Sequence, residues 1–139
     1  YDYSKPIDLG NFQLEVVHCP GHTPGTSSLF FKAQYEGKIV NCAIHGGLGA
    51  GVLQDKELEK VGLPTSLRQD YCNSIEKVIN RPVDVVLPSH VGHAVDYDFF
   101  GIADGKPGAP KSFIDPTAWK RMLTAKRAEI IKLMEESRS

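Results

Sequence analysis

Short alternating runs of apolar and polar residues dominate the first third of the chain. The run FQLEVV at 12–17 alternates and is followed within a few residues by a proline and a glycine, which predicts a strand that ends in a loop. Two further apolar runs, SSLFFK at 27–32 and KIVNCA at 38–43, flank a polar stretch whose Gly37 suits a hairpin. The pattern therefore predicts three successive antiparallel strands.

Two later segments have the periodicity of helices. Over 66–79 the apolar residues share one face, and Ser66 with Gln69 forms a capping-box pattern at the start. A long helix is predicted to begin at Asp115, as an N-cap residue with Pro116 at the first helical position. Its apolar face consists of Trp119, Met122, Leu123, Ile130, Ile131 and Met134.

The segments between these elements read as loops and one more strand. The glycine-rich run HGGLGAG at 45–51 suits a backbone that turns sharply or approaches another group closely. The β-branched run VDVVL at 83–87 is typical of a buried strand, and Pro88 stops it. Residues 101–111 have no apolar period and predict an exposed loop. Together the elements predict a single α/β unit over 1–139.

Composition and charge exclude several classes of partner. With 41% hydrophobic residues, 24% charged residues and a net charge of -1, the chain has an ordinary globular balance, and we expect no nucleic-acid partner. No window approaches the roughly 18 to 20 apolar residues of a membrane span, so no membrane partner is expected. Cys19, Cys42 and Cys72 are odd in number and lack C-x-x-C spacing, which indicates reduced thiols.

The start of the chain indicates a longer parent protein. The first residue is Tyr1 rather than a methionine, within the polar stretch YDYSKPIDLG. We therefore expect the N-terminal part of the parent to be missing. No signal peptide is visible, which favours a cytoplasmic location, although the missing start weakens that inference.

Histidines follow the ends of the predicted strands. Neutral imidazole is a common zinc ligand, and a catalytic zinc ion needs about three protein ligands and an open position. Loops held by a rigid sheet are where such chemistry is placed. The five histidines are His18, His22, His45, His90 and His93.

The surroundings of each histidine separate candidate ligands from structural residues. Prolines and glycines fix the backbone around His22, and Pro88 does the same for His90. His18 is interpreted as a packed or hydrogen-bonded residue at a strand end, and Cys19 as a small buried filler. His45 and His93 remain open: each is either a support for neighbouring groups, a substrate contact or merely exposed.

Three stretches together resemble a known fold family. LEVVHCPGHTPGTSSLFF, GKIVNCAIHGGLG and VDVVLPSHVGH, in this order, resemble the second half of a metallo-β-lactamase-fold hydrolase over about residues 8–100. The resemblance implies half of an αβ/βα sandwich, with a mostly antiparallel sheet and two main helices. It also implies one or two metal ions, usually zinc, with His22 completing the first metal site and His90 the second.

Two departures from the family pattern shape the expectation. The family commonly has an aspartate after the strand predicted at 38–43, whereas this chain reads CAIH at 42–45. Either binding of the second metal is weakened, or the chain resembles the lactamase subclass whose second metal needs no ligand from that strand. We favour the second interpretation. The family motif H-x-H-x-D-H is absent from the chain. We therefore expect a C-terminal half that pairs with the missing N-terminal half or with a second copy.

The leading hypothesis is a metal-dependent hydrolase acting on a small molecule in the full-length parent, with the fragment alone inactive. In this reading a zinc-bound hydroxide attacks a carbonyl or ester carbon. Thr23 and Ser89 would orient the metal ligands, and His45 or His93 would support those ligands or contact substrate.

Two alternatives come from other classes. The chain is instead a non-catalytic association module with structural histidines if it binds no zinc and dimerises tightly through its sheet. A cysteine hydrolase that uses Cys19 with His18 or His22 is the weaker alternative, because near-adjacent residues flanking a proline seldom align as nucleophile and base.

Overall fold

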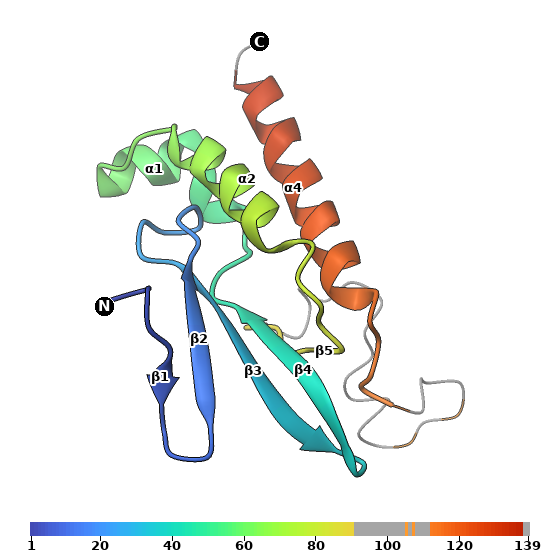
Figure 1. The fold of residues 1–139 in the computed structure, drawn as a ribbon. Helices are drawn as coiled ribbons and strands as arrows, with labels where there is room; N and C mark the ends of the chain where they lie inside the picture. Colours follow the sequence, from blue (N-terminus) through green and yellow to red (C-terminus); the bar gives the residue numbers. More distant parts are fainter. Residues whose placement is uncertain (91–104, 106, 108–111, 138–139) are drawn as a thin grey trace.

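The computed structural model describes residues 1–90, 105, 107 and 112–137 of the chain. Figure 1 shows one sheet with its helices gathered at one side. The strands are β1 (Ile7–Asp8), β2 (Gln13–His18), β3 (Ser27–Tyr35), β4 (Lys38–His45) and β5 (Val85–Val86). The helices are the 3₁₀ helix η1 (Gly51–Leu53) and the α-helices α1 (Asp55–Val61), α2 (Leu67–Val78) and α4 (Ala118–Glu136).

The sheet has the strand order β1-β2-β3-β4-β5, with antiparallel pairing throughout except between β4 and β5. The three predicted antiparallel strands are confirmed. Tyr35 pairs with Lys38, and the two residues between them, Glu36 and Gly37, have φ values of 48° and 75°. Positive φ at both positions is the mark of a type I′ hairpin turn, as Gly37 predicted.

The predicted strand at 83–87 is shorter in the structure, where regular pairing covers only Val85 and Val86. These residues pair in parallel with Cys42 and Ala43 of β4. Val86 belongs to the core beneath the helices and Val85 to an apolar cluster on the opposite face. β5 is therefore buried on both faces, as its β-branched sequence indicates.

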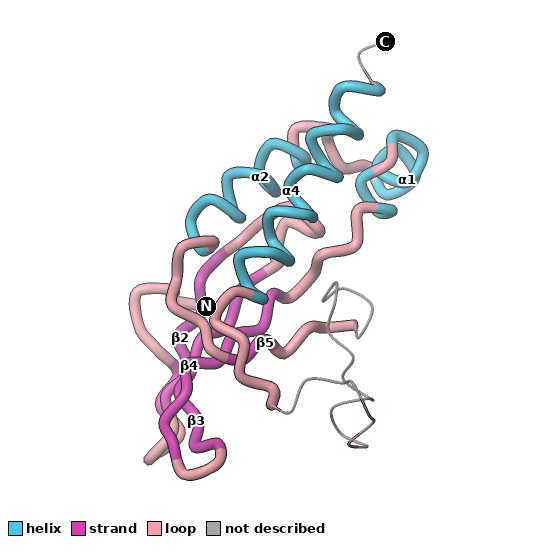
Figure 2. Tube along the Cα trace, turned by 90° about the vertical axis from the view of Figure 1, so that its right-hand side faces the viewer, coloured by secondary structure: helices cyan, strands magenta, loops and turns pink. Residues whose placement is uncertain are grey.

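The helices α2 and α4 pack on one face of the sheet, which Figure 2 shows from the side. The Phe30 ring of β3 lies 5.6 Å from the Trp119 ring of α4 in an edge-to-face arrangement. The indole N–H of Trp119 donates to the carbonyl of Val78, which joins α4 to the end of α2. Of the apolar face predicted for the last helix, four residues are fully buried: Trp119, Met122, Leu123 and Ile130.

The opposite face of the sheet is apolar but less covered. Because successive strand residues point to opposite faces, Phe31 points away from the helices that Phe30 contacts. A small cluster of Val40, Cys42 and Val85 forms there, with Phe31, Ala33, Tyr35, Phe113 and Ile114 packed against it. A sheet with helices on one face and apolar residues on the other is the expected form of half a sandwich.

The start of α2 differs from the prediction. Ser66 has a helical backbone with φ -58° and ψ -20°, and its side chain caps no backbone N–H. Backbone carbonyls accept hydrogen bonds from the first N–H groups of the helix instead. The N–H of Leu67 donates to the carbonyl of Pro64, and the N–H of Arg68 donates to the carbonyl of Thr65. The predicted capping box is wrong, since this turn satisfies the first N–H groups without a side chain.

The last helix starts through the residues that the sequence predicts, although its regular part begins later, at Ala118. The Asp115 carboxylate accepts hydrogen bonds from the backbone N–H and the hydroxyl of Thr117, at 2.9 and 2.7 Å. Arg121 also pairs with Asp115 at 3.0 Å. Partial burial opposes ionisation, but the bonds from Arg121 and Thr117 prevail and lower the pKa of Asp115 to about 2.

Three elements were not predicted: β1, η1 and α1. They are short, and α1 ends at Gly62, whose φ of 69° is the left-handed C-cap that glycine favours. Predicted loop residues 101–111 lie outside the described part of the chain apart from Gly105 and Pro107. Among the described helices, none has a stretch that is long and apolar enough to cross a membrane.

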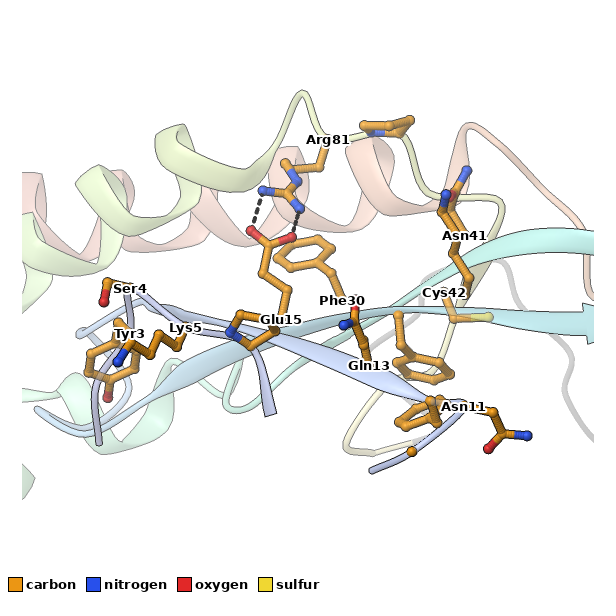
Figure 3. A pocket seen from close by; sticks show the side chains of 16 residues that line it. Tyr3, Ser4, Lys5, Asn11, Gln13, Glu15, Phe30, Asn41, Cys42 and Arg81 are labelled. Carbon is orange, nitrogen blue, oxygen red and sulfur yellow. Dashed lines mark hydrogen bonds and ion pairs between the residues drawn. The ribbon is translucent and has the colours of Figure 1, made fainter. Parts of the chain in front are cut away.

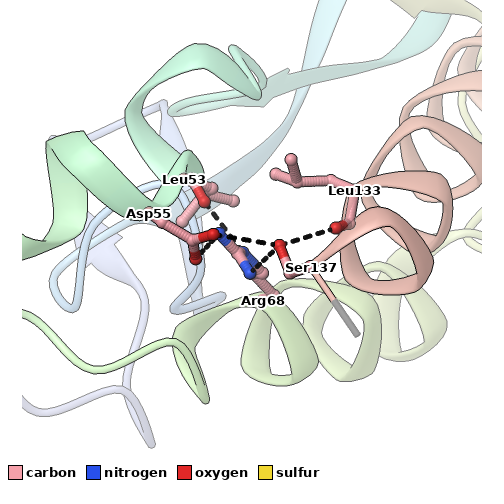
Figure 4. Close-up of polar contacts among 5 residues, drawn as sticks. All are labelled: Leu53, Asp55, Arg68, Leu133 and Ser137. Carbon is pink, nitrogen blue, oxygen red and sulfur yellow. Dashed lines mark hydrogen bonds and ion pairs between the residues drawn. The ribbon is translucent and has the colours of Figure 1, made fainter. Parts of the chain in front are cut away.

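A buried arginine fastens these short elements to the long helices, as Figure 4 shows. Arg68 of α2 is only 3% exposed. Its guanidinium donates to the carbonyl of Leu53 at 2.8 Å, to the carboxylate of Asp55 at 2.7 Å and to the hydroxyl of Ser137 at 2.9 Å. One side chain thus ties η1, α1 and the end of α4 to α2.

Candidate metal-ligand site

The loop that carries His22 closes on itself between β2 and β3. The backbone N–H of Gly21 donates to the carbonyl of Thr23 at 3.0 Å, and the N–H of Thr23 donates to the hydroxyl of Thr26 at 3.0 Å. The two threonine hydroxyls are also 3.0 Å apart. Thr23 therefore closes the turn from within through Thr26, and its predicted role of orienting a metal ligand stays a prediction.

The loop is pressed against α2 through Gly21. A Cβ atom at this position would lie 2.5 Å from both Cα and Cβ of Tyr71. Only glycine allows so close an approach to helix backbone. Tyr71 in turn donates its hydroxyl to the carbonyl of Leu48 at 3.0 Å, so the same residue holds the histidine loop and the glycine-rich loop together.

The imidazole of His22 lies against the glycine-rich segment after β4. Its Nδ1 is 2.9 Å from the carbonyl oxygen of Gly49. A Cβ atom at Gly47 would lie 2.3 Å from Cδ2 of the His22 ring. Because a carbonyl only accepts hydrogen bonds, Nδ1 carries the proton, and in the neutral ring the lone pair is then on Nε2. The glycines therefore admit the ring and fix its tautomer.

His45 lies at the end of β4, behind His22, and is 2% exposed. The N–H of Gly47 approaches its Nδ1 at 3.4 Å, and in the described part of the chain its Nε2 has no hydrogen-bond partner. Burial, with a smaller contribution from the neighbouring His22, lowers the pKa of His45 to about 4. A neutral ring inside the core fits support of the glycine-rich segment better than direct substrate contact.

Ser89 links the segment before His90 to the same strand end. Its hydroxyl donates to the backbone carbonyl of His45 at 2.7 Å. His90 follows at an exposed position. The structure thus brings His22, His45 and Ser89 to one end of the sheet, with His90 adjacent in the chain. His93 lies outside the described residues.

The first histidine and the cysteine of the loop make structural contacts. His18 pairs through Nε2 with the carbonyl of Pro24 at 2.8 Å and stacks on the Tyr3 ring, with ring centroids 4.9 Å apart. Cys19 is buried and accepts a hydrogen bond from Ser28 at 3.4 Å. Burial raises the pKa of the Cys19 thiol, which disfavours the nucleophilic thiolate that a cysteine hydrolase requires.

Sequence reasoning interpreted the glycine-rich run as backbone that turns sharply or approaches another group closely, but it did not identify His22 as that group. It also counted Tyr71 only as part of an apolar helix face. His22 contacts a segment about 25 residues later in the chain, and Gly21 contacts a residue about 50 positions later. Neither alternation nor helical periodicity in a sequence indicates such contacts.

We expect Gly47→Ala to displace the His22 ring because its new Cβ would overlap Cδ2. The cost in stability should be about 1 kcal/mol, since the ring can move aside. The Nδ1 bond to Gly49 would then be lost. Nuclear magnetic resonance of the histidine side chains measures this as a change of the His22 tautomer. Gly51→Ala is the matched control, because no atom lies within 4 Å of a Cβ there.

No family model matches the chain, and no curated protein sequence does so. Solved structures do. BJP-1, a subclass B3 metallo-β-lactamase of Bradyrhizobium japonicum, superposes with a TM-score of 0.78 at 22% identity, covering 98% of this chain and 50% of that one. Native FEZ-1 metallo-β-lactamase from Legionella gormanii gives a TM-score of 0.74 at 23% identity, covering 97% and 50%. The chain has half of the metallo-β-lactamase fold.

Other metallo-β-lactamases agree on this half-fold. GOB-18 from Elizabethkingia meningoseptica gives a TM-score of 0.70 at 21% identity, with coverage of 98% of this chain and 49% of that one. The chain thus spans about half the length of the metallo-β-lactamases that it matches. The expected C-terminal half of an αβ/βα sandwich, with a mostly antiparallel sheet, is confirmed. Identities of this size establish the shared fold and leave the activity of the chain to be proposed.

Proposed function

We propose that this chain is one half of a metal-dependent hydrolase and that His22 is one of its metal ligands. The hydrogen bond between His22 Nδ1 and the Gly49 carbonyl, at 2.9 Å, carries the proposal. Metal-binding histidines commonly donate their second ring nitrogen to a carbonyl or carboxylate, which fixes the ring and its tautomer. The arrangement leaves Nε2 as the ligand atom.

The described residues supply only part of a metal site. Among them, no three histidine, cysteine, aspartate or glutamate side chains are grouped closely enough to hold a metal ion. A catalytic zinc ion needs about three protein ligands. We infer that His22 completes a first metal site and His90 a second, and that the other ligands of both sites come from another polypeptide segment. Together the two sites would hold one or two ions. Imidazole nitrogen is among the ligands that suit zinc.

The other candidate residues act through the two ligands. Thr23 closes the turn that presents His22, and Ser89 ties the segment before His90 to the carbonyl of His45. His45 fills the space behind the glycine-rich segment as a neutral ring. His93, outside the described residues, stays a predicted neighbour of substrate or ligand.

Zinc held by His22 and His90 together with ligands from the other segment would polarise a substrate carbonyl and lower the pKa of a bound water molecule. This chain contributes the ligands and their orientation. The glycine-rich segment 46–51 adds backbone that a small substrate can approach closely. Hydrolysis of a small molecule by attack on a carbonyl or ester carbon, with cleavage of the bond from that carbon to the leaving group, is the reaction class that this chemistry supports.

The uncovered sheet face supports a partner for the half-fold. On the side away from the helices, Leu14, Leu29 and Ile44 are only partly buried, and Leu87 is 38% exposed. Several partly exposed apolar side chains on one sheet face are typical of an interaction site. The proposed occupant is the N-terminal half of the same fold, carrying the H-x-H-x-D-H motif, and a second copy of this chain is the alternative.

The test is a zinc titration of the chain labelled with nitrogen-15 in its histidine side chains. The His22 ring should carry its proton on Nδ1 before zinc is added, and added zinc should perturb its Nε2 signal. His22→Ala should abolish that response. The His18 signals serve as the internal control, because that ring is engaged with Pro24 and Tyr3.

A His22 ring protonated on Nε2 would contradict the proposal, and so would a ring that stays indifferent to zinc when the N-terminal half of the fold is also present. If in addition the chain forms a tight dimer, the result favours the alternative function of a non-catalytic association module. Sedimentation velocity on the same samples separates these two outcomes.

A further inference from the structure

A second feature of the sheet, away from His22, is the edge of β3 that β2 leaves unpaired. β2 pairs with β3 only from Ser27 to Phe30, whereas β4 pairs with β3 from Ser28 to Tyr35. Before Glu15, β2 pairs with β1 instead. In the described part of the chain, the second half of β3 therefore has a strand on one side only.

The backbone groups on this edge follow from the register. Gly46 donates its N–H to the carbonyl of Ser27, so the odd-numbered residues of β3 direct their backbone groups towards β4. The even-numbered residues direct theirs away from β4. The N–H and C=O groups of Lys32 and Gln34 thus face the open side, where a further strand would find two donors and two acceptors.

A cleft of about 730 Å³ opens beside this edge, between β3 and the turn that joins β1 to β2. In Figure 3 the Arg81 guanidinium lies over the Phe30 ring, 4.3 Å from its centre. Arg81 also forms a two-pronged ion pair with Glu15, with one of its bonds at 2.9 Å. The cleft is therefore walled by an aromatic ring and a fixed ion pair on the helix side.

The charge of the cleft favours an acidic partner. Four charged residues line it, and two of them, Glu15 and Arg81, neutralise each other. The remaining two are Lys5 and Lys32, and neither forms an ion pair with another described residue. A second copy of the chain would bring two clefts of the same positive charge together, which disfavours pairing between copies.

We propose that this cleft binds an extended, acidic peptide segment of a partner protein, which adds a strand to the free edge of β3. Backbone hydrogen bonds to Lys32 and Gln34 would give affinity, and carboxylates opposite Lys5 and Lys32 would give selectivity. The inference does not depend on the metal site, because neither of the proposed metal ligands, His22 and His90, lines this cleft.

The test measures fluorescence anisotropy of a fluorescein-labelled peptide that alternates valine and glutamate, titrated with the 139-residue chain. A peptide of equal length that alternates valine and lysine is the control. We expect the acidic peptide to bind at least about tenfold more tightly. Lys32→Glu should weaken its binding by about tenfold, and Lys5→Glu should do the same.

A backbone variant separates strand addition from simple charge attraction. Gln34→Pro removes an outward N–H without removing a donor from the β3–β4 ladder, and proline is tolerated at such edge positions. Gln34→Pro should lose peptide binding, whereas Gln34→Ala should retain it. Circular dichroism of both variants, matched to the parent chain, distinguishes loss of the edge from loss of the fold.

Three results would overturn the proposal. The first is equal binding of the acidic and basic peptides, or no binding of either. The second is unchanged binding by Gln34→Pro. The third is a dimer in sedimentation velocity that Gln34→Pro dissociates, which would make a second copy of the chain the occupant of the edge.

Discussion

Replacing Arg68 with methionine should lower the free energy of unfolding by about 3 kcal/mol, because the carbonyl of Leu53 then loses its donor inside the protein. Asp55 and Ser137 would lose their partner as well. Methionine keeps much of the apolar stem, so the effect reports the guanidinium rather than a cavity. Urea unfolding followed by far-ultraviolet circular dichroism measures the change.

Arg127→Met is the matched control for this prediction. Arg127 pairs with Glu76 at the surface, where both side chains are partly exposed, at 38% and 59%. Pairs of this kind contribute about 0 to 1 kcal/mol. Equal losses for the two variants would show that Arg68 does not clamp η1, α1 and α4 to α2.

The second large effect is expected from Gly21→Ala. The added Cβ would lie 2.5 Å from the Cα of Tyr71, which belongs to helix backbone and cannot turn aside. The loop that carries His22 must then move away from α2, at a cost of about 3 kcal/mol. The Tyr71 bond to Leu48 would be strained by the same movement. Thermal unfolding measures the loss of stability, and zinc titration measures the loss of the presented His22.

Gly25→Ala tests whether that loss is specific to the contact. Gly25 belongs to the same loop, yet no atom lies within 4 Å of a Cβ placed there. Its substitution should change stability by less than about 0.5 kcal/mol. Comparable destabilisation by both variants would mean that the loop depends on glycine flexibility at large and not on the approach of Gly21 to α2.

Local patterns were sufficient for the main elements of the fold. Alternation placed β2, β3 and β4, and Gly37 placed the hairpin between the two longer strands. The shared apolar face placed α4, whose Trp119 is buried against Phe30. These features could be predicted because burial of one face imposes a period that a single sequence displays.

Other features depend on contacts that no period records. Ser66 and Gln69 have the spacing of a capping box, but Pro64 and Thr65 supply the carbonyls that cap the helix start. The two-residue strand β1 exists only through its pairing with β2. Such short elements are fixed by neighbours in space, so a reading of the sequence alone misses them.

The candidate site was predicted residue by residue and only partly assembled. His22 and Ser89 reach the same end of the sheet as His45, whereas their roles as metal ligand and orienting residue stay predictions. The contact that decides the His22 tautomer, with Gly49, was not foreseen. It requires the end of β4 to fold back over the loop after β2, and this geometry follows from strand order rather than from composition.

The order of the strands in the sheet is also their order along the chain. Each strand from β2 to β4 thus pairs with its immediate predecessor, and only β5 reaches its neighbour through a long connection. Low sequence separation between partners is associated with fast folding. The meander should consequently form first, as each strand leaves the ribosome, and β5 should join it only after α1 and α2 have been made.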